Sequence, residues 1–273
     1  MSAAPLQQQA ARLLALHDRR QVLVLPNVWD VASARVVEEA GFPALATSSA
    51  GIAAVLGYAD GEQIPRSEML GMVARIARAV RVPVTADLEA GYGDAAQTVL
   101  LALEAGAVGM NLEDGTAQGR LRSVDEHAAE VRRARAAAEG AGVRFVINAR
   151  TDVYLLGIGE PAARLAATVE RARAYAEAGA SCIFVPGVRD EATIAALAQA
   201  IPLPLNVLAG PGSPPLATLA RLGVARVSVG SGLARAALTA ARRAAVELRD
   251  SGTYSFTEGI LTHAQVNALL GPR

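Results

Sequence analysis

The chain has 273 residues, of which 52% are hydrophobic and 19% are charged, and its formal net charge at pH 7 is zero. This composition supports one sizeable core, and without a basic stripe or a block of like charge we expect neither a nucleic-acid nor a membrane partner. All 26 basic residues are arginine, which excludes enzymes that need a lysine to form a Schiff base or to hold pyridoxal phosphate.

The first 20 residues predict a short amphipathic helix, because no long apolar core follows a basic start as it would in a signal peptide. Elsewhere the apolar runs are far shorter than the ~18–20 residues that span a bilayer. A single cysteine, Cys182, leaves no partner for an intrachain disulfide. We therefore expect a cytoplasmic protein.

Short apolar runs then alternate with helical stretches rich in Ala, Arg and Glu. Strands are predicted near residues 22–25, 44–47, 82–86, 108–112, 144–149, 181–185, 203–207 and 226–229. Helices are predicted near residues 30–40, 67–80, 94–105, 123–139, 161–178, 190–200, 215–222 and 231–249. A strand followed by a helix, repeated eight times, predicts an α/β fold of the closed (β/α)₈ type, a TIM barrel with parallel strands. An open doubly wound sheet is the alternative, but no glycine-rich dinucleotide turn follows the first strand.

The end of the chain extends past the eighth strand–helix unit. No linker or composition break divides the sequence, so residues 1–273 are predicted to form a single barrel domain. Residues 250–273 are predicted as a C-terminal helical extension that either caps the barrel or docks on a partner subunit.

Carboxylates follow two neighbouring predicted strands. Asp87 and Glu89 come after the third strand, and Glu113 and Asp114 come after the fourth. All strands of a parallel barrel deliver their carboxyl ends to the same rim, and acidic ligands without His or Cys favour Mg²⁺ first and Mn²⁺ second. The alternative is a helix N-cap or a salt bridge to arginine, which we favour for Asp114 but not for the other three residues.

The three histidines of the chain do not follow any predicted strand. His17, His127 and His263 all lie in predicted helical or terminal segments. This placement argues against a histidine-based zinc site and against a Ser-His-Asp triad.

Arg150 ends the fifth predicted strand, within the run INARTD. Its planar guanidinium matches a carboxylate or a phosphate, and with no lysine in the chain an anionic substrate needs arginine, backbone N–H groups or the metal. We expect Arg150 to contact the substrate. The alternative, a pair with Asp152 or Glu113 that only orders the site, is compatible with that role.

Small residues follow the second strand at Ser48, Ser49 and Ala50, where backbone N–H groups can approach an anion. Asp60 lies further along the same rim segment. Trp29 and Asp30 follow the first strand, where Asp30 can cap a helix and Trp29 can either fill space or line the pocket.

As a set, several motifs in this order resemble the isocitrate lyase/phosphoenolpyruvate mutase superfamily. They are PNVWDVASARVVEEAGFPALATSSAGIAAVLGYADGE, ADLEAGYGD, NLEDG, INARTD and VPG before a final PLNVL, spread over about residues 20–250. The resemblance implies a (β/α)₈ barrel that binds Mg²⁺ and a small 2-oxo acid and works through an enolate. It also implies a homo-oligomer, a dimer or tetramer, whose last helix is often exchanged between subunits.

The resemblance assigns roles to individual positions. Asp87 matches the principal metal ligand, and Glu89 and Glu113 stand beside it and act mostly through water. Many members have Asp where this chain has Glu89. The loop that holds the carboxylate of the 2-oxo acid corresponds to Ser48, Ser49 and Ala50. Catalytic or substrate-site positions are Asp60 and Arg150, with Trp29 and Asn206 as further substrate contacts.

One loop departs from the family pattern and guides the choice of reaction. Isocitrate and methylisocitrate lyases carry a Lys-Lys-Cys-Gly-His loop, whereas residues 114–126 contain no Cys, Lys or His. We therefore expect a Mg²⁺-dependent lyase for a small 2-oxo acid, with oxaloacetate decarboxylation as the concrete candidate. The alternatives are a phosphonopyruvate or carboxyphosphonoenolpyruvate mutase or hydrolase, a methylisocitrate or isocitrate lyase-like enzyme, and a non-catalytic barrel that binds 2-oxo acids.

Overall fold

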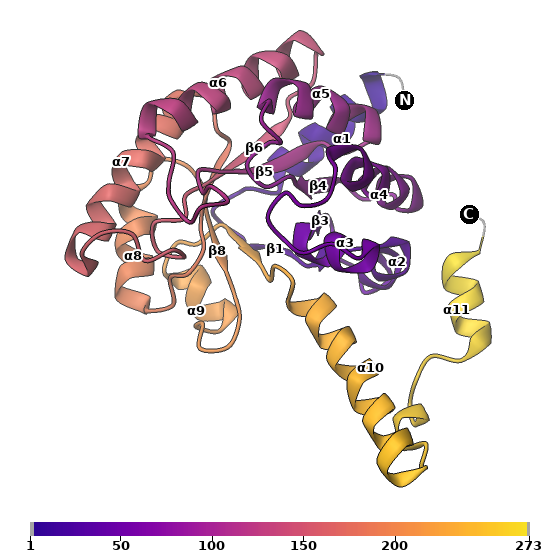
Figure 1. The fold of residues 1–273 in the computed structure, drawn as a ribbon. Coiled ribbons are helices and arrows are strands. Elements are labelled where there is room, and N and C mark those ends of the chain that lie inside the picture. Colours follow the sequence, from indigo (N-terminus) through magenta and orange to yellow (C-terminus); the bar gives the residue numbers. More distant parts are fainter. Residues whose placement is uncertain (1–2, 272–273) are drawn as a thin grey trace.

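Parallel strands from the whole length of the chain form one sheet that closes on itself (Figure 1). The computed structural model describes residues 3–271. The strands are β1 Leu23–Leu25, β2 Asn27–Val28, β3 Leu45–Thr47, β4 Val84–Asp87, β5 Gly109–Glu113, β6 Val146–Arg150, β7 Cys182–Val185, β8 Leu205–Leu208 and β9 Arg226–Ser228. Their order is β1-β9-β8-β7-β6-β5-β4-β3-β2, and every pair is parallel.

The two ends of that order are halves of one strand, interrupted at Pro26. Proline has no N–H to give to the ladder, so β1 pairs with β9 before it and β2 pairs with β3 after it. The carbonyl of Pro26 still accepts a hydrogen bond from Ala46 N–H at 3.2 Å. The nine strands assigned within residues 3–271 therefore correspond to eight barrel strands, because β1 and β2 together form one of them. The predicted (β/α)₈ barrel is confirmed.

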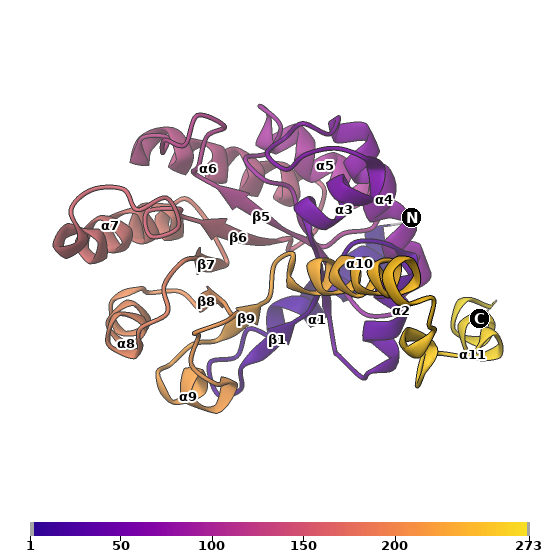
Figure 2. The same cartoon turned by 60° about the horizontal axis from the view of Figure 1, so that its bottom comes forward.

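Helices cover the outside of the barrel (Figure 2). They are α2 Val31–Glu39, α3 Ser49–Leu56, α4 Arg66–Ala79, α5 Ala95–Ala105, α6 Val124–Gly140, α7 Arg164–Glu177, α8 Glu191–Ala200 and α9 Leu216–Arg221. Asp30 caps α2 by accepting from Ser33 N–H, as its position after the first strand predicts. Helix α3 is an addition, because the sequence predicts only a rim loop there.

Many inward-facing side chains of the strands are polar, beside apolar ones such as Leu25 and Phe184, whereas the outward-facing side chains are mostly apolar. In β5, for example, Asn111 points inward between Met110 and Leu112, which pack outward. Buried polar residues of this interior are Asn27, Thr85, Asn111, Asn148, Asn206, Arg226 and Ser228. A TIM barrel is usually filled with branched apolar residues, so these polar groups call for an explanation.

Helix α1, Ala3–Ala15, closes the end of the barrel opposite the candidate site. The side chains of Gln7 and Gln9 bond to the backbone just before β6 and β4, at Arg144 and Arg81 respectively. His17, directly after the helix, is buried and lies 3.5 Å from the guanidinium of Arg226 inside the barrel. The amino-terminal end of the barrel is thus plugged.

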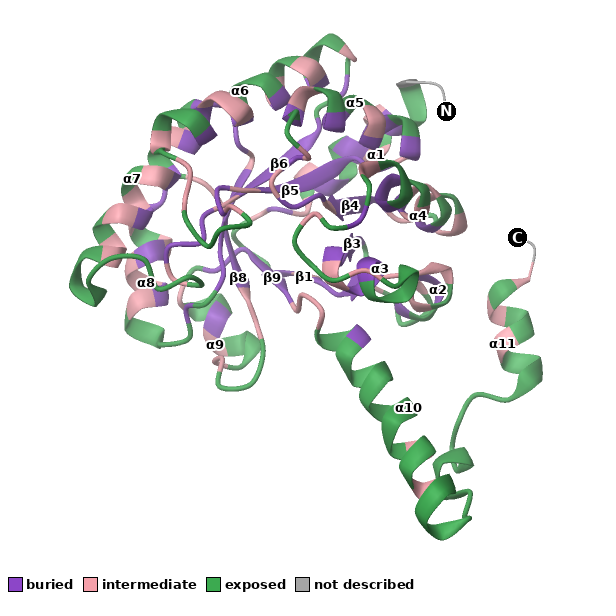
Figure 3. Cartoon of the chain, in the orientation of Figure 1, coloured by how far each residue is buried: buried purple, intermediate pink, exposed green. Residues whose placement is uncertain are grey.

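The last two helices leave the barrel as an arm. Figure 3 shows α10, Gly232–Ser251, projecting away with an almost fully exposed surface, followed by α11, His263–Leu270. Leu238, Tyr254 and Ile260 on this arm are about 60% exposed, at 60%, 67% and 59%. Helix α11 returns to lie beside α2. Among the described residues, no helix combines the length and apolar character that a membrane crossing requires.

Candidate functional site

Three charged side chains lie above the polar interior of the barrel, at the carboxyl ends of neighbouring strands. Asp87 is the last residue of β4, Glu113 of β5 and Arg150 of β6. All three occupy inward-facing positions, so they converge on the mouth of the barrel.

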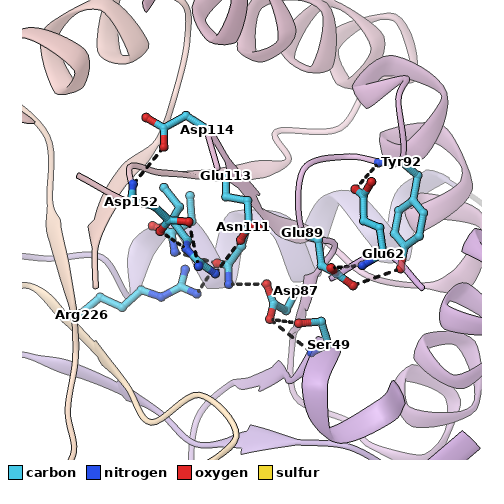
Figure 4. Close-up of polar contacts among 12 residues, drawn as sticks. Ser49, Glu62, Asp87, Glu89, Tyr92, Asn111, Glu113, Asp114, Asp152 and Arg226 are labelled. Carbon is cyan, nitrogen blue, oxygen red and sulfur yellow. Dashed lines mark hydrogen bonds and ion pairs between the residues drawn. The ribbon is translucent and has the colours of Figure 1, made fainter. Parts of the chain in front are cut away.

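The Asp87 carboxylate is held in one orientation by its neighbours (Figure 4). Its Oδ2 accepts from Ser49 Oγ at 2.7 Å and from Ser49 N–H at 3.2 Å. Its Oδ1 accepts from Asn111 Nδ2 at 3.1 Å. Because Ser49 is the first residue of α3, the added helix brings its amino-terminal end directly to this carboxylate.

Arg150 is bound to two carboxylates. Its Nη1 lies 2.6 Å from Glu113, while Nε and Nη2 donate to the two oxygens of Asp152 at 2.6 and 3.0 Å. The ring of Phe184 lies beneath the guanidinium at 5.8 Å. A guanidinium has five N–H donors, and these contacts use three. The ordering role is therefore present, and the contacts among the described residues leave two N–H donors of Arg150 unused.

A second cluster, formed by Glu62, Glu89 and Tyr92, ties the rim loops together. Glu62 N–H donates to Glu89 Oε2 at 2.5 Å, Tyr92 N–H donates to Glu62 Oε1 at 2.8 Å, and Tyr92 Oη lies 3.5 Å from Glu89 Oε1. All three residues have a positive φ, between 51° and 56°. Such backbone conformations cost about 1–3 kcal/mol each and are characteristic of functional sites.

The electrostatics of the rim are unbalanced toward negative charge. Burial and the nearby Asp87 raise the pKa of Glu89 to about 7. Burial raises the pKa of Glu113 even though the Arg150 guanidinium acts in the opposite direction. Desolvation and Asp87 also raise the pKa of Asp60. Several carboxylates thus lie close enough to raise one another's pKa, and a divalent ion would relieve their repulsion.

In the part of the chain that the structure describes, the rim carboxylates do not form a closed metal-binding cage. Within residues 3–271, no group of three His, Cys, Asp or Glu side chains converges closely enough to hold an ion by itself. Glu89 is turned toward Glu62, and Glu113 toward Arg150. This arrangement fits Mg²⁺, which commonly takes one or two protein carboxylates and keeps several waters.

The remaining predicted residues lie at different depths. Ser48 caps α3 by accepting from Gly51 N–H at 3.1 Å, and Ala50 lies in the first turn of that helix. Trp29 packs so closely on Gly51 that a Cβ there would lie 2.8 Å from the Cβ of Trp29. Asp60 is exposed on the loop at 57–65.

Asn206 lies deeper than a rim contact would. Its side chain is fully buried inside the barrel, 3.4 Å from Ser228 Oγ, and its Nδ2 has no hydrogen-bond partner among the described residues.

Asp114 anchors the segment that leaves β5. It is fully buried and accepts from Asp152 N–H at 2.9 Å, from Arg171 Nη1 at 3.0 Å and from Tyr175 Oη at 2.8 Å. The hairpin that follows is closed by a bridge between Gly115 and Leu121. Asp114 therefore forms the salt bridge to arginine that the sequence analysis favoured. Its partners lie 57 and 61 residues away, so no local signal could identify them.

Sequence reasoning missed four further residues near the site. They are Asn111, Glu62, Tyr92 and Arg226. Asn111 and Arg226 alternate with apolar residues in their strands, and that alternation was the available signal.

Comparisons with known proteins agree with this geometry. The family model of phosphoenolpyruvate phosphomutase matches residues 13–249. An oxaloacetate decarboxylase of Pseudomonas aeruginosa is 35% identical over 227 residues, covering 78% of this chain and 76% of that protein. A crystal structure described as a lyase/mutase of Burkholderia cenocepacia J2315 superposes with a TM-score of 0.90 at 41% identity, covering 97% and 96% of the two chains. A phosphonopyruvate hydrolase, solved with oxalate and Mg²⁺, superposes with a TM-score of 0.83 at 26% identity, covering 96% and 94%.

Proposed function

The chain belongs to the phosphoenolpyruvate phosphomutase family of enzymes, and from this premise we propose that it is a Mg²⁺-dependent lyase for a small 2-oxo acid. Oxaloacetate is the proposed substrate and decarboxylation the proposed reaction. The observation that carries the proposal is the cluster of rim carboxylates, where burial and the charge of Asp87 raise the pKa of Glu89 and of Glu113 although Arg150 pairs with Glu113. The likeness to oxaloacetate decarboxylases supports the choice of substrate.

We propose Asp87 as the protein ligand of Mg²⁺, with Mn²⁺ as the second choice. Glu89 and Glu113 would hold the water molecules of the ion. When bound, the ion supplies Lewis-acid stabilisation of negative charge on the 2-oxo oxygen. The contacts of Ser49 and Asn111 keep the Asp87 carboxylate fixed, so no reorientation is needed when charge develops.

The other rim residues would bind the substrate and move the proton. The two free donors of Arg150 and the Ser48–Ala50 turn would hold the carboxylates, with Trp29 packing beside that turn. In oxaloacetate the C3–C4 bond breaks, C4 leaves as CO₂, and the electron pair remains on the enolate of pyruvate. C3 then takes a proton, and we assign its delivery to Asp60, whose carboxyl lies close enough to Asp87 for that charge, together with desolvation, to raise its pKa.

The hairpin at 115–122 separates this reaction from its alternatives. It lies beside the mouth and is anchored by Asp114, so it is placed to cover the site. Because it carries no Cys, Lys or His, it lacks the acid/base of an isocitrate lyase-like cleavage. A phosphonopyruvate mutase or hydrolase remains the second candidate, favoured by the likeness to the hydrolase solved with oxalate and Mg²⁺.

The test is a turnover assay with purified protein, Mg²⁺ and oxaloacetate, in which pyruvate is measured by a coupled lactate dehydrogenase. Asp87→Ala should reduce the rate to the background that Mg²⁺ alone gives, while circular dichroism shows an unchanged fold. Phosphonopyruvate, followed by phosphorus NMR, is the competing substrate. Turnover of phosphonopyruvate with none of oxaloacetate would replace the lyase by the second candidate.

We further propose that the protein works as a homo-oligomer, a dimer or tetramer, whose C-terminal arm docks on a second copy. The exposed apolar residues of the arm, among them Leu238 and Ile260, support this assembly. Two further statements also remain predictions: residues 1–273 form one domain, and the protein acts in the cytoplasm.

A further inference from the structure

Arg226 is a charged residue in the middle of the barrel interior. It begins β9, is fully buried, and has no carboxylate within salt-bridge distance among the described residues. Its only polar contacts there are long, 3.4 Å to Asn111 Oδ1 and 3.5 Å to His17 Nε2, and its Nε has no partner. His17 cannot neutralise it, since an imidazole carries no negative charge; burial and the charge of Arg226 lower its pKa to about 4 and keep it uncharged.

Such a residue is costly to the fold. Removing a guanidinium from water without a counter-ion costs several kcal/mol, and replacing buried ionic groups with apolar residues of similar volume is often neutral or stabilising. The fold alone therefore gives no reason to keep Arg226, which points to a role in the site above it.

One side chain connects Arg226 to the rim (Figure 4). Asn111 Oδ1 accepts from Arg226 Nη2 and from Asn148 Nδ2, the latter at 2.7 Å. With both donors on the oxygen, the amide has one favourable orientation, in which Nδ2 donates to Asp87 at 3.1 Å. The contact between Arg226 and Asn111 crosses the barrel, because β9 and β5 are not neighbours in the sheet.

We infer that Arg226 is a positioning residue that acts through Asn111 on Asp87 and places a fixed positive charge beneath the bound substrate. The inference rests on the proposed function. It adds a specific consequence: the charge below the mouth favours a substrate with two negative charges and disfavours a bare cation. Arg226 should therefore strengthen binding of the anion while weakening, or leaving unchanged, binding of Mg²⁺ alone.

The experiment measures two affinities by calorimetry, Mg²⁺ alone and oxalate to the Mg²⁺-loaded protein. Arg226→Met removes the charge at similar volume, and Arg226→Lys restores the charge. Arg35→Met is the matched control, because Arg35 is another buried arginine, bonded to the carbonyl of Ala79 far from the mouth. Thermal unfolding of each variant reports on the fold separately.

For Arg226→Met we expect oxalate to bind about tenfold more weakly, the order of one nearby charge at an effective dielectric near 20, with Mg²⁺ binding no weaker than in the wild type. Arg226→Lys should recover most of the loss, and Arg35→Met should leave both affinities unchanged. In the background of Asn111→Ala, the effect of Arg226→Met should shrink only by the part that passes through the amide, because the charge itself acts through space.

Equal oxalate affinity in the wild type and Arg226→Met would overturn the inference, as would weaker Mg²⁺ binding with unchanged oxalate binding. If Arg226→Met fails to fold, Arg226→Lys carries the test: a folded Arg226→Lys protein that binds oxalate about tenfold more weakly than the wild type would also overturn the inference, because the charge would be present without its effect. A wild-type protein that binds neither Mg²⁺ nor oxalate would instead refute the proposed function, and the role of Arg226 would fall with it.

Discussion

Removing the carboxylate of Asp87 should abolish the response of the protein to Mg²⁺ while leaving the fold intact. At a Mg²⁺ concentration 100-fold above its dissociation constant, binding stabilises the folded state by about 2.7 kcal/mol. For 273 residues, an unfolding entropy of about 2.1 cal/mol/K per residue gives about 0.57 kcal/mol/K. The wild type should therefore melt about 5 °C higher with Mg²⁺ than without it.

The metal-free Asp87→Ala protein should stay close to the wild type in stability. The variant loses an acceptor for Ser49 and Asn111, at about 1 kcal/mol for each hydrogen bond. It also loses the repulsion that contributes to the raised pKa of Glu89, which offsets part of this cost. We expect its melting temperature to fall by only a few degrees and to show no shift with Mg²⁺.

Differential scanning fluorimetry with and without Mg²⁺ is the assay, and Asp94→Ala is the control. Asp94 caps α5 by accepting from Gln97 N–H at 3.1 Å, so its loss should cost about 1 kcal/mol, or about 2 °C. That control should keep the full Mg²⁺ shift. If Asp87→Ala gained the same shift as the wild type, the ion would bind elsewhere and the reasoning would be refuted.

Three further outcomes follow from the same contacts. Glu89 has a pKa of about 7 in the folded protein, above its usual value of 4.5, so the folded state binds its proton more tightly than the unfolded state. As the pH rises from 5 to 8, the metal-free protein should therefore lose about 2–3 kcal/mol of stability. Urea unfolding measures this dependence, and Glu89→Gln should flatten it. Asp114→Asn leaves the charge of Arg171 without its carboxylate, so it should lower the free energy of unfolding by about 3 kcal/mol. It should also speed hydrogen exchange in residues 115–122, and unchanged exchange would contradict the anchoring role. A chain ended after Ser251 should keep its barrel but form smaller assemblies in light scattering, and an unchanged mass would exclude residues 252–273 from the interface.

The barrel and the acidic rim were predictable because their signals are local. Each strand–helix unit has its own apolar run and helix cap, and the end of a parallel strand fixes where Asp87 and Glu113 lie. Helix α3 was missed because SSAGIAAVLG follows its strand with no polar break, so the small residues indicated only a loop.

Other features depend on contacts between distant parts of the chain. The anchor of Asp114 needs Arg171, 57 residues away, and the relay beneath the site needs Arg226, 115 residues from Asn111. The positive φ of Glu89 is also invisible in sequence, because that backbone conformation usually indicates glycine. One sequence gives no measure of such pairings, whereas closure of the barrel brings them together.

The two faces of the barrel sheet contribute differently to stability and to chemistry. Hydrophobic free energy is gained in the shell between the outer face of the sheet and the helices, through residues such as Met110, Ile147 and Val207. The inner face carries most of the buried hydrogen-bonding groups, beside apolar residues such as Leu25 and Phe184. Substitutions of the polar groups along the axis should therefore act on chemistry and cost the fold about 1 kcal/mol for each hydrogen bond lost. Truncations in the shell should weaken the protein and leave its selectivity unchanged.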